Sequence, residues 1–186
     1  MLNYLATALP AGTSPDTRLI ALQCALRMNA RIQVSLPHGL LRSLRLGFDP
    51  RPWQELEQAR WLRRIPNRAT GAAVLLDATL LGQAPTRPDR CHAADRALRA
   101  SCLGRTGALG PLPQVIRTYL AARSLYETGH GLSEADRTVH ECGIQPDELP
   151  HLLEQLTGKG LLRSWWIAAD TEDLHWILRT PHCPQS

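Results

Sequence analysis

The chain lacks the features that mark several common classes of protein. No apolar run in its 186 residues approaches the roughly 18 that a membrane-spanning helix needs. The stretch from Met1 to Gly12 has no basic residue ahead of its short apolar run, so we expect no secretion signal. Glycine-rich phosphate loops, the G-x-S-x-G nucleophile elbow and the H-E-x-x-H pattern are also missing. We therefore expect no membrane span, no enzymatic activity, no catalytic residues and no cofactor.

Cysteine is present but not in a pattern that builds a site. Five cysteines, an odd number with scattered spacing, do not form a disulfide framework in a chain of this length. The pairs Cys91-His92 and His182-Cys183 lack the C-x₂-C or H-x₃₋₅-H spacing of structural zinc sites. We expect reduced thiols, no bound metal and a cytoplasmic location.

Lysine is almost absent, and the charge is unevenly distributed. Lys159 is the only lysine among 21 basic residues. The planar guanidinium of arginine is suited to binding phosphate and guanine. A GC-rich coding sequence is the alternative explanation for the excess of arginine over lysine. The formal net charge of +4 divides into +5 for residues 1–84, +3 for 85–111 and −4 for 112–186. A polyanion would therefore approach the first two thirds of the chain and avoid the last third.

The clearest pattern lies between Leu132 and Leu178. Ser133, with Asp136 three residues later, indicates a helix start, and Gly143 breaks that helix. The apolar period from Asp147 to Leu156 predicts a second helix. Alternating segments at 161–167 and 174–178, around a turn at 170–173, predict a tryptophan-rich hairpin, and a further helix is expected from Pro113 to Glu127.

The first half repeats this plan less clearly. The predicted elements are a helix at 19–28, a strand at 32–34, a helix at 36–44 capped by Ser35, a helix at 50–65 capped by Asp49, and a short hairpin from 72–76 and 80–81. Laying residues 17–65 over 113–161 pairs Gly47 with Gly143 and Pro50 with Pro146 at the predicted breaks. This match indicates an internal duplication. A polar, proline-rich stretch at 84–88 and a helix at 93–103 would connect the copies.

Helix, turn, helix and two-stranded ribbon, in that order, resemble the winged helix-turn-helix superfamily of many bacterial transcription regulators. The residues that carry the resemblance are Leu132–Ala135, Cys142–Ile144, Leu149, Leu152, Leu153, Leu156, Gly160–Leu162 and Trp176–Leu178. The predicted fold is mainly α with small β-hairpins: a winged-helix domain at 1–84, a helical linker at 85–111 and a second winged-helix domain at 112–186. The resemblance implies that the second helix of a pair docks in the major groove while the hairpin touches the adjacent backbone.

In the first module, Arg51, Gln54 and Gln58 share one face of the helix at 50–65. Arginine can pair with guanine and glutamine with adenine, so these three are expected to read bases, and flanking arginines are expected to contact phosphates. An ordinary solvated helix face is the alternative. The predicted DNA-binding residues are Arg42, Arg45, Arg51, Gln54, Gln58, Arg60, Arg63, Arg64 and Arg68.

The corresponding helix of the second module is acidic, with Asp147, Glu148 and Glu154 beside His151 and Gln155. Phosphates repel such a surface, and the hairpin turn at 170–173 adds three more acids. We expect this module to pair subunits or bind a protein partner. Trp165, Trp166 and Trp176 are the predicted contact residues, because tryptophan is enriched at interface hot spots; an ordinary hairpin core is the alternative.

The sequence thus predicts a sequence-specific, double-stranded-DNA-binding transcription regulator that acts as a cytoplasmic homodimer. A tandem winged-helix scaffold for protein assemblies, or a plasmid replication or segregation protein, is the alternative. The two differ in the surroundings of the arginines at 50–68. Exposure on one face favours DNA binding, whereas pairing with Glu55, Glu57 or Asp77 favours the scaffold.

Overall fold

A computed structural model describes residues 1–47, 49–65, 71–77, 80, 82, 84–102 and 109–179, with the backbone alone at 99–102. These residues form eight helices and two three-stranded antiparallel sheets, which confirms a mainly α fold with small β-hairpins. The elements are α1 (Leu2–Ala8), α2 (Pro15–Arg27), β1 (Gln33–Ser35), α3 (His38–Ser43), α4 (Arg51–Gln58), β2 (Leu62–Arg64), β3 (Ala72–Leu75), α6 (Arg87–Cys102), α7 (Pro111–Arg123), β4 (His130–Glu134), α8 (Ala135–Cys142), α9 (Glu148–Gly158), β5 (Leu162–Ile167) and β6 (Asp173–Leu178).

One order of elements occurs twice along the chain. Helix, strand, two helices and two strands form an N-terminal unit, residues 15–75, and the same order forms a C-terminal unit, residues 111–178. In both sheets the last strand lies in the middle, giving the orders β1-β3-β2 and β4-β6-β5. The bounds of α7 lie 96 residues after those of α2 at both ends, which is the offset of the sequence match.

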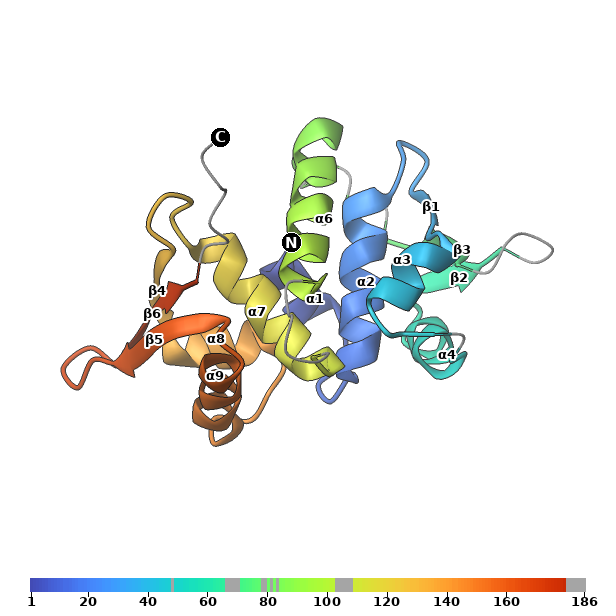
Figure 1. Cartoon of the computed structure of the whole chain (residues 1–186). Coiled ribbons are helices and arrows are strands. Elements are labelled where there is room, and N and C mark those ends of the chain that lie inside the picture. Colours follow the sequence, from blue (N-terminus) through green and yellow to red (C-terminus); the bar gives the residue numbers. More distant parts are fainter. Residues whose placement is uncertain are drawn as a thin grey trace, which may run out of the picture.

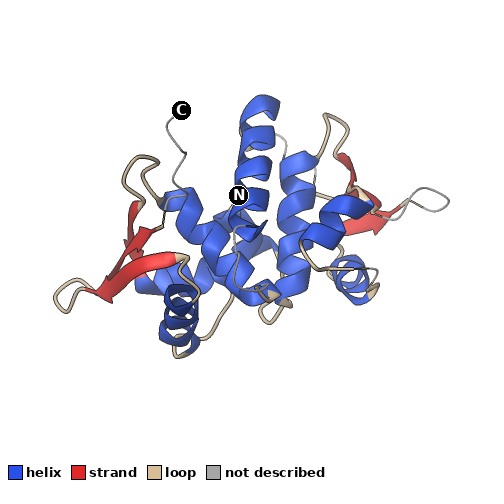
Figure 2. Cartoon of the chain, in the orientation of Figure 1, coloured by secondary structure: helices blue, strands red, loops and turns tan. Residues whose placement is uncertain are grey.

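The first helices of the two units form the centre of the molecule. Pro15 and Pro111 stand in the first turn of α2 and α7, where a missing N–H costs no hydrogen bond. Both helices are buried on most of their surface, as is expected of helices without a wide polar face. They contact each other, and the two sheets lie at opposite ends of the molecule (Figures 1 and 2). A single apolar core runs through both units.

Two further helices cover this centre. α1 contacts α2 and α8, and α6 lies against both α2 and α7 (Figure 1). Arg90 of α6 is buried, and its guanidinium donates to Met28 O at 3.1 Å and to Pro85 O at 2.7 Å. A cation at the carbonyl end of α2 is favourable for the helix dipole. The helix predicted at 93–103 begins earlier than predicted, at Arg87, and packs against the apolar core.

The predicted helix at 50–65 is wrong in its second half. α4 ends at Gln58, because Arg60 adopts a left-handed φ of 53° and Trp61 N–H returns to Leu56 O at 3.0 Å. The chain then enters β2, which pairs with β3. Arg63 and Arg64 are therefore strand residues, and β3 pairs with β2. Of the predicted partner strand at 80–81, Leu80 is helical and Leu81 lies outside the described residues.

Two serines that were predicted to cap helices lie on strands instead. Ser35 pairs with Ala72 in the first sheet, and α3 begins three residues later at His38. Ser133 is buried in β4, where its hydroxyl shares a 2.7 Å hydrogen bond with the Tyr119 hydroxyl. Strand β4 had no counterpart in the sequence prediction, because its partner β6 lies some forty residues further along the chain.

Other expectations are confirmed. Gly143 ends α8 with a left-handed φ of 67°, and β5 pairs with β6 around the predicted turn. None of the helices in the described part of the chain is long and apolar enough to span a membrane.

Candidate nucleic-acid interface

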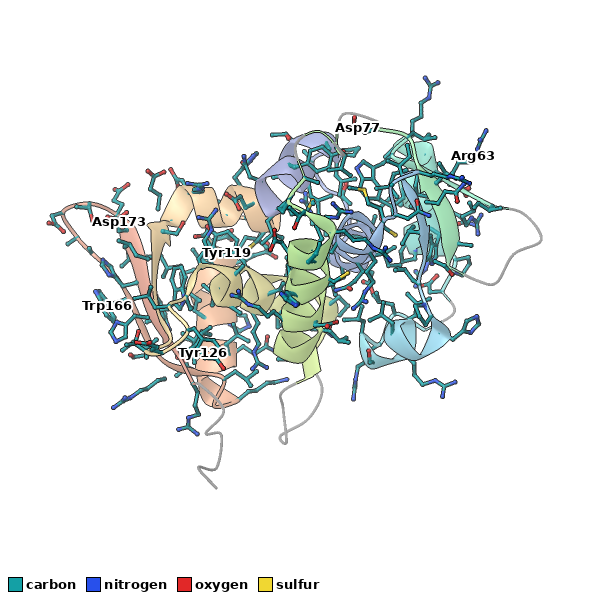
Figure 3. All side chains as sticks on the ribbon, turned by 90° about the horizontal axis from the view of Figure 1, so that it is seen from above. Arg63, Asp77, Tyr119, Tyr126, Trp166 and Asp173 are labelled. Atoms are coloured by element: carbon teal, nitrogen blue, oxygen red, sulfur yellow. The ribbon has the colours of Figure 1, made fainter. Side chains whose placement is uncertain are left out.

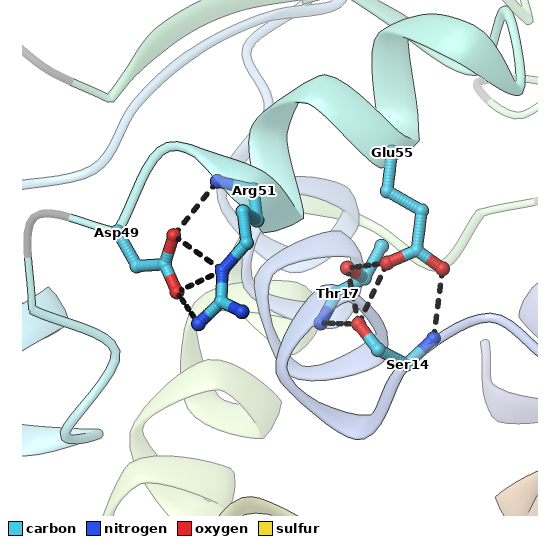
Figure 4. Close-up of polar contacts among 5 residues, drawn as sticks. All are labelled: Ser14, Thr17, Asp49, Arg51 and Glu55. Atoms are coloured by element: carbon cyan, nitrogen blue, oxygen red, sulfur yellow. Dashed lines mark hydrogen bonds and ion pairs between the residues drawn. The ribbon is translucent and has the colours of Figure 1, made fainter.

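A carboxylate holds α4 against the start of α2. Ser14 N–H donates to Glu55 Oε1 at 2.8 Å, while the Ser14 and Thr17 hydroxyls donate to Oε2 (Figure 4). Burial alone would raise the pKa of Glu55, but these hydrogen bonds outweigh it and bring the pKa below the ordinary value. The negative charge also lies at the N-terminal end of α2, where the helix dipole stabilises it. Sequence reasoning missed this contact, although the Ser-Pro-Asp-Thr helix start supplied a signal for one side of it.

The anchored helix presents the predicted face to solvent. Pro52, Trp53 and Leu56 of α4 are buried, whereas Arg51, Gln54 and Gln58 are exposed. Positions three and four residues apart share one side of a helix, so these three side chains form a single stripe. The stripe matches the sequence prediction, even though the helix is shorter than predicted.

Two of the flanking cations are paired with acidic neighbours. Arg51 forms an ion pair with Asp49 at 2.7 Å and holds the pKa of that carboxyl below its ordinary value (Figure 4). Arg64 pairs with Glu57 at 2.8 Å. Both pairs are solvent-exposed, and such pairs contribute little stability, so a phosphate can replace the carboxylate. In the described part of the chain, no carboxylate pairs with Arg42, Arg45, Arg60 or Arg63.

Two arginines of this surface stand where the backbone is left-handed. Arg45 follows α3 with φ 59° and Arg60 follows α4 with φ 53°. The corresponding helix ends of the C-terminal unit, defined by the same backbone hydrogen bonds, have Gly143 and Gly160, both with φ 67°. Gly143 therefore matches Arg45 in the structure, and not Gly47 as in the sequence alignment. A left-handed conformation costs a non-glycine residue about 1–2 kcal/mol. The N-terminal unit therefore keeps a cation at two positions where glycine is the more stable choice.

All of the predicted DNA-binding residues that the structure describes are exposed. They come from the end of α3, from α4 and from the first strand of the hairpin, and Arg63 projects from the sheet at one end of the molecule (Figure 3). Arg68 lies outside the described residues. The exposed set is Arg42, Arg45, Arg51, Gln54, Gln58, Arg60, Arg63 and Arg64. We call this set the basic face, in which Arg63 and Arg64, as successive strand residues, point to opposite sides of their sheet.

The corresponding surface of the C-terminal unit is acidic. In α9, Leu149, Leu152 and Leu153 are buried, while Glu148 and Glu154 are exposed. The turn of the β5–β6 hairpin exposes Asp170 and Glu172. α4 and α9 occupy the same place in the two units, yet the exposed face of α4 carries Arg51, Gln54 and Gln58, whereas that of α9 carries Glu148 and Glu154.

The three hairpin tryptophans do not form one surface, which corrects the prediction. Trp176 is fully buried, and its indole N–H donates to the Ser124 hydroxyl at 2.8 Å, so it is a core residue. Trp165 pairs with Trp176 across the strands and packs against the core. Trp166 points to the opposite side of the sheet, is 44% exposed and stacks on His175 at 5.0 Å.

An apolar patch surrounds Trp166 on the outer side of its sheet. Leu132, His175 and Trp166 are directly opposite one another on β4, β6 and β5, so their side chains emerge from one face. Leu132 is 53% exposed, and Leu125, in the turn before β4, is 67% exposed. Figure 3 shows Trp166 and Tyr126 at the end of the molecule opposite Arg63. We call Leu125, Leu132, Trp166 and His175 the outer patch.

The cysteines described by the structure are not arranged for chemistry. Cys24 and Cys142 are fully buried, and burial raises the pKa of both thiols. Within the described ranges, no three His, Cys, Asp or Glu residues are grouped so that they could hold a metal ion.

Comparison of the chain with models of known protein families, with curated proteins and with solved structures found no match.

Proposed function

We propose that this chain is a double-stranded-DNA-binding transcription regulator built from two winged helices. The N-terminal unit reads DNA with α4 in the major groove and β2 beside the backbone, and the C-terminal unit pairs subunits. The order of elements and the strand order of each unit support the winged-helix assignment. A cytoplasmic location is part of the same proposal.

The observation that carries the proposal is the pair of strained arginines on the basic face. Strained backbone positions cluster at functional sites. Two of the four non-glycine residues with a left-handed φ in the described chain belong to the basic face, and the other two are Ile32 and Glu172. Arg45 and Arg60 flank the exposed stripe Arg51, Gln54 and Gln58, so phosphate contacts would hold that stripe in the groove.

The scaffold alternative is favoured by one specific observation. Arg64 pairs with Glu57, as expected if the arginines serve the fold, and Arg51 pairs with Asp49. A scaffold or segregation protein would use the same faces to bind proteins. Under that alternative, removal of a cation from the basic face leaves duplex DNA affinity unchanged.

The outer patch supports pairing of subunits through the C-terminal unit. A DNA-binding domain that inserts one short helix into the groove has limited sequence specificity. A dimer that binds two half-sites one helical turn apart has a higher sequence specificity. Trp166→Glu places a charge in the centre of the patch and is expected to shift a dimer to monomer in sedimentation measurements. A wild-type chain that is monomeric at micromolar concentration contradicts this part of the proposal.

Two equivalent arginines provide a matched test of DNA binding. Arg63 follows the buried Leu62 in β2, and Arg163 follows the buried Leu162 in β5. We expect Arg63→Gln to lower the slope of log affinity against log salt concentration by about 1, because one phosphate contact is lost. Arg163→Gln is the control and leaves the slope unchanged.

Base reading needs a separate measurement. A random duplex library selected on the full-length chain identifies a site, and fluorescence anisotropy then compares that site with bulk DNA. We expect the Arg51→Ala and Gln54→Ala double variant to lose about 10- to 100-fold in affinity for the site and little for bulk DNA. Equal losses would exclude these residues as base readers, and no duplex affinity at low salt would exclude the proposed function altogether.

A further inference from the structure

A cavity in the described part of the chain lies where the two units meet. It has a volume of about 460 Å³, within the range of small-molecule sites. Its walls come from α2 of the N-terminal unit, from α7 and α8 of the C-terminal unit, and from α1 and α6. The residues that line it are not part of the basic face or of the outer patch.

The deep part of the cavity is apolar with one polar exception. Leu22 and Leu26 of α2 and Ala97 of α6 line it and are buried. Thr118 of α7 also lines it and is 5% exposed, and its hydroxyl has no hydrogen-bond partner among the described residues. A buried hydroxyl without a partner is unfavourable, and native proteins rarely leave one unsatisfied. A bound molecule with an oxygen at this depth would satisfy it.

The remaining polar wall carries an excess of positive charge. Arg123 Nη2 and Arg137 Nε both donate to Glu141 Oε1, at 2.7 and 2.8 Å, and Glu141 is buried. The third cation, Arg96, is exposed, and its one described polar contact is a 3.3 Å donation to Ala121 O. Three guanidinium groups and one carboxylate thus line the cavity. Guanidinium groups bind carboxylates through paired hydrogen bonds.

We propose that this cavity binds a small organic carboxylate with an apolar body. The carboxylate lies at the exposed arginines Arg96 and Arg137, and the apolar body covers Leu22, Leu26 and Ala97. An oxygen near its far end accepts a hydrogen bond from the Thr118 hydroxyl. Because the walls belong to both units, such a ligand stabilises the junction between them and raises the melting temperature. The proposal does not depend on DNA binding.

The first test uses chemical probes on the full-length chain. Octanoate, its neutral analogue octanamide, and inorganic phosphate are titrated in calorimetry and in thermal unfolding. We expect octanoate to bind saturably, octanamide to bind about tenfold more weakly because it lacks the charge, and phosphate to bind weakly because it lacks the apolar body. No saturable binding of octanoate at millimolar concentration overturns the proposal. Equal affinity for octanamide, or for phosphate, overturns it as well.

The second test locates the ligand. Ala93 of α6 lines the cavity and is half-buried, so Ala93→Leu fills part of the space and is expected to weaken octanoate binding about tenfold. Arg96→Gln is expected to weaken it several-fold. Arg87→Gln, an exposed arginine of the same helix outside the cavity, is the matched control. Unchanged affinity in Ala93→Leu, or equal losses in the two arginine variants, places the ligand elsewhere and overturns the proposal.

Thr118→Val removes the unpaired hydroxyl at almost constant volume. We expect 7-oxooctanoate to bind the wild-type chain more tightly than octanoate does, and to lose this advantage in the variant. If Ala93→Leu fails to fold, this comparison and the Arg96→Gln variant still decide the outcome. A 7-oxooctanoate advantage that survives Thr118→Val removes Thr118 from the site. All of these readouts are ligand binding without DNA, so failure here leaves the proposed regulator function standing.

Discussion

The N-terminal and C-terminal units share an order of elements but differ in the surface they present. α4 offers an arginine and two glutamines with unpaired arginines around them, whereas α9 exposes glutamates. The C-terminal unit, whose sequence resembles a winged helix more clearly, is the one that phosphate would repel. Resemblance of fold and suitability for DNA are therefore separate properties within one chain.

The two units also fill their sheets differently. In the C-terminal unit Trp176 lies opposite Gly131, and a Cβ on that glycine would meet the indole at 2.1 Å. In the N-terminal unit Ala73 lies opposite Val34. A large residue opposite a glycine in the C-terminal sheet thus takes the place of a valine opposite an alanine in the N-terminal sheet, so Trp176 fills more of its core than either N-terminal residue.

The largest effect should come from removing that side chain. We expect Trp176→Ala to lower the free energy of unfolding by about 3–5 kcal/mol, because it leaves a cavity where the buried indole packed. Trp166→Ala, on the exposed side of the same sheet, should lower it by less than about 1 kcal/mol. Urea unfolding followed by circular dichroism measures both. Similar losses in the two variants would contradict the division into core and outer-patch tryptophans.

A smaller effect is expected where α4 is held on α2. The pKa of Glu55 is lowered in the folded state, so its contribution to stability is complete above the unfolded-state pKa and is lost as pH falls through the folded-state value. Glu55→Gln should lower the free energy of unfolding by about 1–2 kcal/mol at neutral pH and by less in acid. Glu57→Gln, which loses an exposed pair, is the control. A loss that does not shrink in acid would contradict an ionised Glu55.

The left-handed arginines provide a test in which stability and binding change in opposite directions. Arg45→Gly and Arg60→Gly relieve unfavourable φ angles and should raise the free energy of unfolding by about 0.5–1 kcal/mol each. Under the proposed function they also weaken DNA binding. The reverse exchange, Gly160→Arg, should destabilise the C-terminal unit by a similar amount. Unchanged DNA affinity in both glycine variants would mean that the two arginines serve no DNA contact.

The smallest effect concerns charge on α9. In Figure 1, α4 and α9 lie on the same side of the molecule. Under the proposed function, the glutamates of α9 would therefore repel the phosphates of a duplex bound to α4. Glu148→Gln with Glu154→Gln should raise affinity for bulk duplex DNA about two- to fivefold at low salt and less at high salt. Glu127→Gln, an exposed acid outside α9, is the control. An equal gain from the control would reduce the effect to net charge alone.

The sequence by itself determined the features that depend on neighbours along the chain. Periodic leucines predicted α9, Gly143 predicted the end of α8, and the spacing of Arg51, Gln54 and Gln58 predicted one exposed stripe. It also determined the opposite charges of the two ends. These properties follow from local backbone preferences and helical repeat, which need no distant partner.

Only the tertiary structure decided the rest, because the deciding contacts join residues far apart in sequence. Ser133 became a strand residue through pairing with β6, and α4 ended at Gln58 because the following residues pair with β3. Trp165 lies on the side of the sheet that buries Trp176, and Trp166 lies on the other side, because successive residues of β5 point to opposite faces. The pairing of β5 with β6 sets which residue faces the core. The cavity between the units arises from five helices meeting, and no stretch of sequence contains it.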